Sequence, residues 1–278
     1  MKRRSLLSAA AGVAAFPAIV GRAPAWGAEL KLDVANPEHQ FLIHRKLAYA
    51  MSSDVTYWML VGIRYGHVDH KLVPLWQMNV ASWFSVKDMD AGAYEVTQMG
   101  ATFYTDPKTG AFMESFKNPF NGKDYKIPYF KPTVRKNQFQ LGHKESRPPR
   151  PGFKVDSQEE RVAGIDGGDV WIRADNFTRS TPDDPAKWYM QIHDLSTYYG
   201  ALKDVANTDN KNPAARWAFN DLNTFPDYME MGQGRGMFFS RALGHKIFRY
   251  QDMPALWRDL MDKRYPDVAR DPAGALKG

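Results

Sequence analysis

The sequence predicts a mainly β protein, built as a single antiparallel barrel or strongly bent sheet with a flanking helix at each end. Between positions 55 and 130, β-branched and aromatic residues cluster in short runs, which turn residues separate at intervals of roughly ten. A helical pattern precedes these runs and a second one closes the chain. A barrel of about eight strands can enclose one small ligand, so its interior is the expected functional site.

The first half of the chain predicts one helix followed by consecutive antiparallel hairpins. Asn36 and Pro37 are typical of a helix cap and first turn, and an apolar stripe runs from Phe41 to Ala48. The turns at 106–110 and 118–123 place proline early and glycine late, as tight bends require. The expected strands are 55–65, 72–86, 94–104, 111–116 and 125–130.

The second half predicts fewer strands and ends in a helix. Residues 143–185 are rich in proline and glycine and are expected to be mostly loop, with one strand at 169–174. Strand character returns at 187–199 and again at 236–241. In the closing helix, Asp252 is the expected cap and Pro254 the first-turn residue.

Residues 1–28 are expected to be a twin-arginine signal peptide and linker, followed by a single β-rich domain at 29–278. The paired arginines Arg3 and Arg4 precede an apolar stretch, and Ala23-Pro24-Ala25 matches a cleavage site. The alternative is a membrane anchor, but about 15 apolar residues are fewer than the ~20 that span a bilayer. We therefore expect a periplasmic or secreted protein, with the twin-arginine translocase as its partner during export and no permanent membrane anchor.

Composition excludes several classes of protein. A mean hydropathy of −0.52 with 24% charged residues fits neither a disordered chain nor a polytopic membrane protein. The formal charge of +6 is concentrated in residues 1–25, which hold basic but no acidic side chains, so nucleic-acid binding is not expected. The absence of cysteine excludes disulfides, thiolate zinc sites and cysteine nucleophiles, and no cofactor is expected.

Several segments together carry a family resemblance. They are the twin-arginine start, Tyr-Thr-Asp-Pro-Lys-Thr-Gly at 104–110, the turn at 116–123, and the segments 229–241 and 244–246. With these segments, the chain resembles the bacterial and fungal proteins grouped as domain of unknown function 1838, over about the whole mature chain. By analogy the resemblance implies a barrel related to the calycins, and it implies no particular catalytic residues.

Two polar patterns have ordinary structural explanations. His67 and His70 flank Asp69 and could form half a metal site, but a hairpin tip explains them better, and no third ligand is evident. The glycines at 232–236 lack the strand and helix context of a phosphate-binding loop, so a bend entering a strand is expected. Arg235 within that bend is expected to face a pocket.

Arg64 and His193 are the main candidates for chemistry. Arg64 shares a strand face with Trp58, Leu60 and Gly62, so it either lies inside and meets a carboxylate or lies on a solvated face. His193 is either a proton-transfer group or a structural histidine with satisfied hydrogen bonds. Glu230 is one of two acidic residues in apolar sequence surroundings.

We expect an exported barrel enzyme that acts on a small hydrophobic or aromatic molecule by acid–base chemistry, as a lyase or isomerase without a metal. The alternatives are a non-catalytic periplasmic carrier and an accessory subunit of an exported enzyme. An enzyme predicts a titratable group of shifted pKa inside the cavity, whereas a carrier predicts polar groups only at its mouth. The expected catalytic residues are His193, Arg64 and Tyr198; the expected substrate-binding residues are Trp76, Trp171, Trp217, Arg235 and Glu230.

Overall fold

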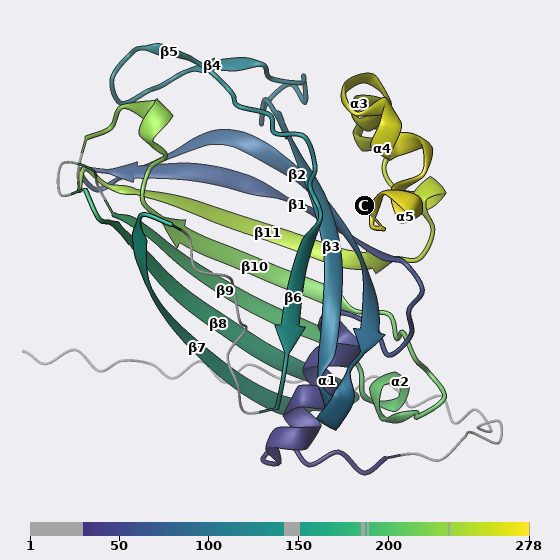
Figure 1. Ribbon diagram of the computed structural model, residues 1–278. Coiled ribbons are helices and arrows are strands. Elements are labelled where there is room, and N and C mark those ends of the chain that lie inside the picture. Colours follow the sequence, from purple (N-terminus) through teal and green to yellow (C-terminus); the bar gives the residue numbers. More distant parts are fainter. Residues whose placement is uncertain (1–29, 142–150, 185–186, 188, 233, 278) are drawn as a thin grey trace, which may run out of the picture.

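The computed structural model describes residues 30–141, 151–184, 187, 189–232 and 234–277, and the predicted export signal lies outside these ranges. The chain is mainly β, as predicted, and nine strands form one antiparallel sheet that curls through 267° into a half-barrel (Figure 1). The strand order is β6-β3-β2-β1-β11-β10-β9-β8-β7. β4 and β5 form a separate two-stranded sheet.

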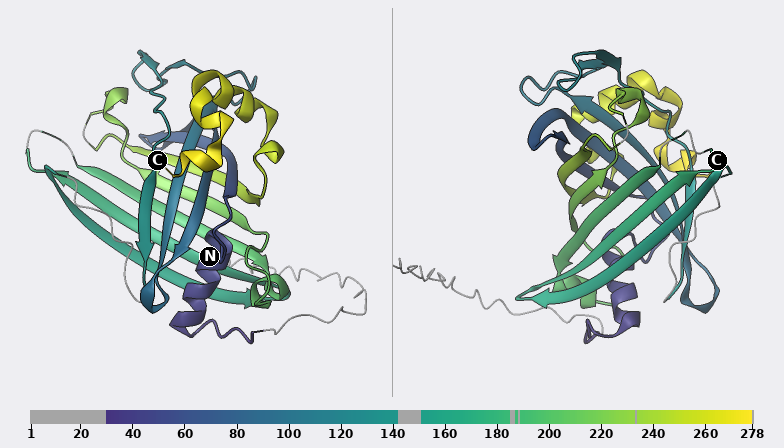
Figure 2. Two further views of the ribbon diagram at one scale, coloured as in Figure 1. Left: turned by 45° about the vertical axis from the view of Figure 1, so that its right-hand side comes forward. Right: turned by 90° about the vertical axis from the view of Figure 1, so that its left-hand side faces the viewer.

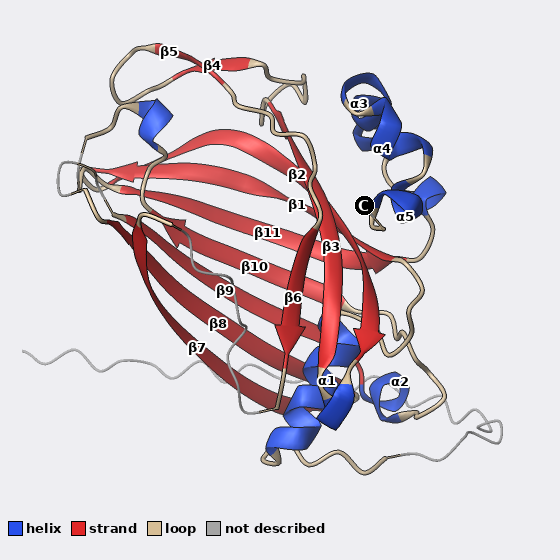
Figure 3. Cartoon of the chain, in the orientation of Figure 1, coloured by secondary structure: helices blue, strands red, loops and turns tan. Residues whose placement is uncertain are grey.

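The strands are β1 Thr56–Val68, β2 Lys71–Asp88, β3 Tyr94–Thr105, β4 Ser115–Lys117, β5 Asp124–Lys126, β6 Arg135–Phe139, β7 Phe153–Asp166, β8 Asp169–Pro182, β9 Met190–Ala201, β10 Arg216–Asn223 and β11 Met237–Ile247. The helices are α1 Pro37–Ala48, α2 Leu202–Ala206, α3 Ala255–Arg264, α4 Pro266–Arg270 and α5 Pro272–Ala275. Strands dominate the described chain; α1 precedes them in the sequence, α2 lies between β9 and β10, and α3, α4 and α5 follow β11 (Figure 3). Within the described ranges, no helix is both long and apolar enough to cross a membrane.

The hairpin predicted at residues 67–70 is present as the tip between β1 and β2. Asp69 and His70 have φ angles of 48° and 64°, so both lie in the left-handed region that a two-residue hairpin turn requires. Groups of acidic residues and histidines able to hold a metal ion are absent from the residues that the structure describes. His70 is therefore part of the turn itself, and His67 lies before it in β1.

The prediction that residues 143–185 are mostly loop is wrong. β7 and β8 are 14-residue strands that pair from Phe153 to Asp166 and form one of the longest hairpins of the sheet. Gly164 lies in β7 because the ring of Trp171 on β8 fills the place of its side chain, 2.3 Å from an ideal Cβ. β7 is an edge strand with a largely exposed polar sequence, so it lacks the apolar alternation that marks a buried strand.

The closing helix is present as α3, which starts after Pro254 and ends before Pro266 as its sequence pattern predicts. Two short helices that were not predicted follow it, α4 and α5, because Pro266 and Pro272 each start a new helix. Asp252 does not cap α3, which begins after Pro254; its carboxylate instead pairs with Arg249 at 2.8 Å. These helices pack on the outer face of β1, β2 and β3, where the indole Nε1 of Trp83 donates to the Pro272 carbonyl at 2.9 Å (Figure 2).

α1 begins as predicted, with the Asn36 side chain accepting from the Glu38 amide at 2.8 Å and Pro37 in the first turn. Figure 1 shows α1 at one end of the half-barrel, where it contacts β7, β8 and β9. All residues from Ile43 to Ala48 are buried, including three basic or polar ones: His44, Arg45 and Lys46. α1 therefore covers one end of the sheet interior.

Lys246 of β11 fastens the end of α1 to the sheet. Its ammonium donates to the carbonyls of Lys46 and Tyr49 at 2.7 and 2.5 Å, and to Asn212 Oδ1 and the Pro213 carbonyl at 3.0 and 3.3 Å. The carbonyls at a helix C-terminus lack intrahelical partners and carry the negative end of the helix dipole. A buried lysine amine is thus hydrogen-bonded where α1 ends, and its burial lowers the pKa of Lys246 well below the usual lysine value.

Replacing Lys246 by methionine is expected to lower the free energy of unfolding by about 3 kcal/mol, because it leaves buried carbonyl groups without donors. Urea denaturation followed by circular dichroism measures this loss. The exposed Lys263→Met variant on α3 is the control and should change stability by less than about 0.5 kcal/mol. Equal effects of the two substitutions would contradict the anchoring role of Lys246.

Candidate functional site

A row of polar side chains crosses the inner face of the half-barrel. Six residues occupy directly paired positions on neighbouring strands, and paired residues project to the same face of a sheet. We call this row the polar belt; from β7 to β1 it consists of Glu159, Asn176, Asp194, Asp221, Ser240 and Arg64. Three carboxylates and one guanidinium therefore line the interior between two largely apolar regions.

Arg64 and Asp221 form an ion pair at the centre of the belt. Arg64 Nη1 lies 3.0 Å from Asp221 Oδ2, and the two side chains are 13% and 4% exposed. The guanidinium also lies 4.4 Å above the Phe238 ring. Of the two alternatives for Arg64, the structure shows the interior one, with a carboxylate of the protein as the partner.

A cavity of about 330 Å³ lies between the polar belt and α1. We call it the aromatic chamber, because its lining includes the rings of Tyr49, Trp58, Phe84, Phe139, Tyr198, Trp217 and Phe219. Polar side chains share the wall: Ser82, Gln98, Asn137, Glu159, Arg161, Asn176, Asp194 and Ser196. The chamber thus combines flat apolar surfaces with charged and hydrogen-bonding groups.

Two predicted site residues, Tyr198 and Trp217, meet in this chamber. They are directly paired on β9 and β10, and their rings stack with centroids 5.1 Å apart and an interplanar angle of 26°. Trp58 meets Trp217 edge-on at 5.7 Å. The indole Nε1 of Trp217 is buried and makes no hydrogen bond to any residue that the structure describes.

His44 of α1 lines the same chamber and was not predicted. Its side chain is buried against the rings of Tyr49, Phe139 and Tyr198, whose centroids lie 5.7 to 6.0 Å away. Burial, and secondarily the positive charge of Arg161, holds the pKa of His44 well below its usual range. His44 Nδ1 has no hydrogen-bond partner among the described residues. Its position on the apolar helix stripe, three residues after Phe41, was the signal that could have identified it.

The chamber wall includes both edge strands of the sheet. Glu159 and Arg161 of β7 form an ion pair, with each side chain less than one-fifth exposed. Asn137 and Phe139 of β6 lie across the opening and line the same cavity. β6 and β7 are the two edges of the sheet and are not paired with each other, and the cavity lies between them.

A second cavity, of about 560 Å³, lies on the other side of the belt. We call it the loop pocket, because residues within 224–232 and 234–236, between β10 and β11, form much of its wall. Arg64 and Phe238 line it from the sheet. The glycine-rich bend enters β11 at Met237, as predicted, and Gly232, Gly234 and Gly236 have positive φ angles.

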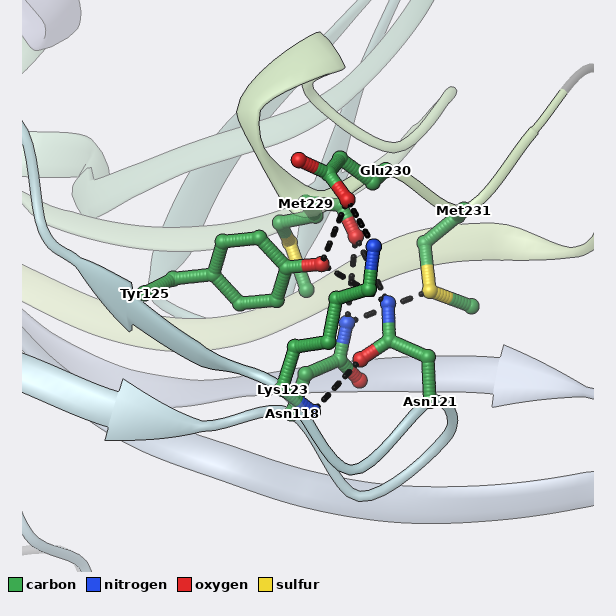
Figure 4. Close-up of polar contacts among 7 residues, drawn as sticks. All are labelled: Asn118, Asn121, Lys123, Tyr125, Met229, Glu230 and Met231. Atoms are coloured by element: carbon green, nitrogen blue, oxygen red, sulfur yellow. Dashed lines mark hydrogen bonds and ion pairs between the residues drawn. The ribbon is translucent and has the colours of Figure 1, made fainter.

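Glu230 does not have the apolar surroundings expected for it. Its exposed carboxylate forms an ion pair with Lys123 of the turn between β4 and β5, and this contact lowers the pKa of Glu230 (Figure 4). Asn118 and Asn121 of the same turn donate to the Met229 carbonyl at 3.3 and 3.1 Å. The small sheet is thereby attached to the loop that lines the loop pocket.

The remaining predicted residues are dispersed. Trp76 is 1% exposed and packs in the inner core against Tyr104, Phe116 and Phe238. Trp171 and His193 lie on the outer face: Trp171 covers Gly164, and His193 contacts the Phe177 ring with centroids 4.5 Å apart. Arg235 is exposed in the bend. Successive side chains of a strand point to opposite faces, so His193 points outward because its neighbours Ile192 and Asp194 face inward.

Comparison with known proteins gives one similarity, and it lies in the first half of the chain. A search of curated proteins and a search of solved structures each found no match. A family model matches residues 33–149, a range that runs from α1 to β6 and includes Arg64 and His44. Over these residues the chain matches the family described as "Protein of unknown function (DUF1838)", which confirms the resemblance drawn from its turn motifs.

Proposed function

We propose that this chain binds a small, flat aromatic molecule in the aromatic chamber and acts on it by acid–base chemistry of its own side chains. The observation that supports this most strongly is the buried histidine, His44, in a ring-lined cavity that also contains carboxylates. The proposal includes export by the twin-arginine route to the periplasm, on the basis of the first 28 residues.

The size of the chamber favours a molecule of about two fused rings. A dry cavity of about 150 Å³ accepts benzene in other proteins, and the chamber measures about 330 Å³. Ligand pockets of this size usually combine apolar walls with a few polar groups that fix orientation. Rings such as Trp217 and Tyr198 offer flat surfaces for stacking.

Proton transfer is the chemistry that the polar groups of the chamber favour. The lowered pKa keeps His44 neutral near pH 7, and a neutral imidazole can accept a proton. Glu159 and Asp194 line the same cavity, and Glu159 pairs with Arg161 and so offsets the positive charge that opposes the imidazolium form. The proton taken from one carbon or oxygen of the substrate can then be returned to another, as an isomerase or lyase requires.

A non-catalytic carrier is the second candidate. The observation in its favour is that His44 Nδ1 has no hydrogen-bond partner in the described part of the chain, whereas catalytic histidines are usually oriented by one. Against it, polar residues such as Asn176 and Asp194 line the chamber wall on the sheet itself and not only its mouth. Binding and turnover must therefore be measured separately.

Binding is tested with 2-tetralone, a two-ring ketone, by isothermal titration calorimetry. Trp217→Leu is expected to weaken binding at least about tenfold, because it removes the stacking surface of the chamber. Trp171→Leu, on the outer face, is the matched control and should bind like the wild type. Circular dichroism establishes that both variants are folded. Equal losses in the two variants would refute the chamber as the binding site.

Turnover is tested by following deuterium uptake into 2-tetralone in D2O by NMR. A base that removes a proton next to the carbonyl is expected to speed exchange by about a hundredfold over buffer, and His44→Gln should abolish the increase. His245→Gln, on the outer face of β11, serves as the control. Tight binding of 2-tetralone without faster exchange would reject the proposal of an enzyme and support that of a non-catalytic carrier.

The lowered pKa of His44 also predicts how stability depends on pH. Below about pH 6.5 the unfolded chain binds a proton on this histidine that the folded chain does not, so stability falls as pH falls, by up to about 1.4 kcal/mol per pH unit. His44→Leu removes the group that binds this proton, so the variant should lose up to about 1.4 kcal/mol per pH unit of the slope. Urea denaturation at pH 5, 6 and 8 measures the slope, and the pH 8 comparison isolates packing effects. An unchanged slope in the variant would contradict the burial of a neutral His44.

A further inference from the structure

The loop pocket differs in chemistry from the aromatic chamber. Its walls are mainly aliphatic and aromatic, with a volume of about 560 Å³; among them are Ile192, Phe225, Pro226, Met231 and Phe238. Two polar residues of the sheet, Arg64 and Asn223, also line it. A molecule in this pocket would bury apolar surface and meet polar atoms at the sheet.

Asp221 orients both of these polar residues through a single oxygen atom. Its Oδ2 lies 3.0 Å from Arg64 Nη1, in the ion pair, and accepts a hydrogen bond from Asn223 Nδ2 at 2.9 Å. Because the amide nitrogen of Asn223 is used in this way, its Oδ1 remains as an acceptor; this atom is buried and has no partner among the described residues. A buried acceptor without a donor carries a free-energy cost, which a bound donor would remove.

Arg64 supplies the complementary donor. Its Nη1 is paired with Asp221, and its Nε donates to Met78 Sδ at 3.3 Å. Nη2 makes no hydrogen bond to the part of the chain that the structure describes. The pocket therefore has an unused donor on Arg64 and an unused acceptor on Asn223, and Asp221 Oδ1, next to them, is also buried without a partner among the described residues.

We propose that the loop pocket is a second binding site, for a neutral, mainly apolar molecule that carries a hydroxyl group. A hydroxyl donates one hydrogen bond and accepts others, so it can donate to Asn223 Oδ1 while accepting from Arg64. This site does not depend on the function proposed for the aromatic chamber. The two cavities lie on opposite sides of the polar belt and share no lining residue.

Charged head groups fit the pocket less well. An ammonium group has no acceptor for the Arg64 donor and would place a second positive charge beside the guanidinium. A carboxylate would satisfy Arg64 but would leave Asn223 Oδ1 without a donor, next to the charge of Asp221. Asp227 also lines the pocket and adds negative charge against an anion, whereas the carboxylate of Glu230 is paired with Lys123. Selectivity among head groups is therefore the property to measure.

The experiment compares nonan-1-ol, nonanoate and nonylammonium by isothermal titration calorimetry on the full-length protein. We expect nonan-1-ol to bind at least about tenfold tighter than either ion. Asn223→Leu should weaken nonan-1-ol binding about tenfold and leave 2-tetralone binding unchanged. Asn220→Leu, on the outer face of the same strand, is the matched control.

Three outcomes would overturn the proposal. They are equal binding of all three probes, tighter binding of an ion, and undiminished nonan-1-ol binding in Asn223→Leu. Loss of nonan-1-ol binding in Trp217→Leu would place the alcohol in the aromatic chamber and reject the second site. Failure of 2-tetralone to bind would count against the proposed function alone, because these two probes report on different cavities.

Discussion

The hydrogen bonds of Lys246 hold together the parts of the molecule that make an interior. A sheet curled through 267° leaves its inner face uncovered, and α1 must close one end for a cavity to exist. α1 alone is only 12 residues long, which is marginal for a helix in water. The ammonium of Lys246 binds the carbonyls where this helix ends, so the position of His44 in the chamber depends on a lysine from the far end of the chain.

The polar belt divides this interior into two regions of different character. On the α1 side, rings and charged groups of both edge strands form the aromatic chamber. On the other side, the loop between β10 and β11 forms a more apolar pocket, to which the turn between β4 and β5 is attached. Arg64 and Asp221 lie between them and neutralise each other, which permits charged groups so deep in a largely apolar structure.

Features encoded by local residues could be predicted from the sequence. The cap of α1 and the tip between β1 and β2 follow from Asn36-Pro37 and from Asp69, and both are present. The location of the Arg64 side chain could be narrowed to two alternatives, because an arginine among apolar neighbours is either buried with a carboxylate or exposed. These inferences needed only the residues themselves and their immediate neighbours.

Features that depend on distant pairing could not be predicted. The partner of Arg64 is 157 positions away in the chain, and nothing in a single sequence identifies Asp221. The sequence of β9 alone does not show which of its two faces points inward, because pairing with β8 and β10 decides this. His193 was therefore predicted to lie at the site, although it lies on the outer face. The β7–β8 hairpin was missed because an exposed edge strand is stabilised by backbone pairing and carries little apolar signal.

The belt also has a consequence for folding fidelity. Successive strand residues face opposite sides, so a slip of one residue in β10 would turn Asp221 outward and leave Arg64 buried alone. Breaking a buried pair in this way costs about 3–5 kcal/mol. A row of six polar residues, four of them charged, thereby penalises misregistered sheets, and part of its value lies in the structures it prevents.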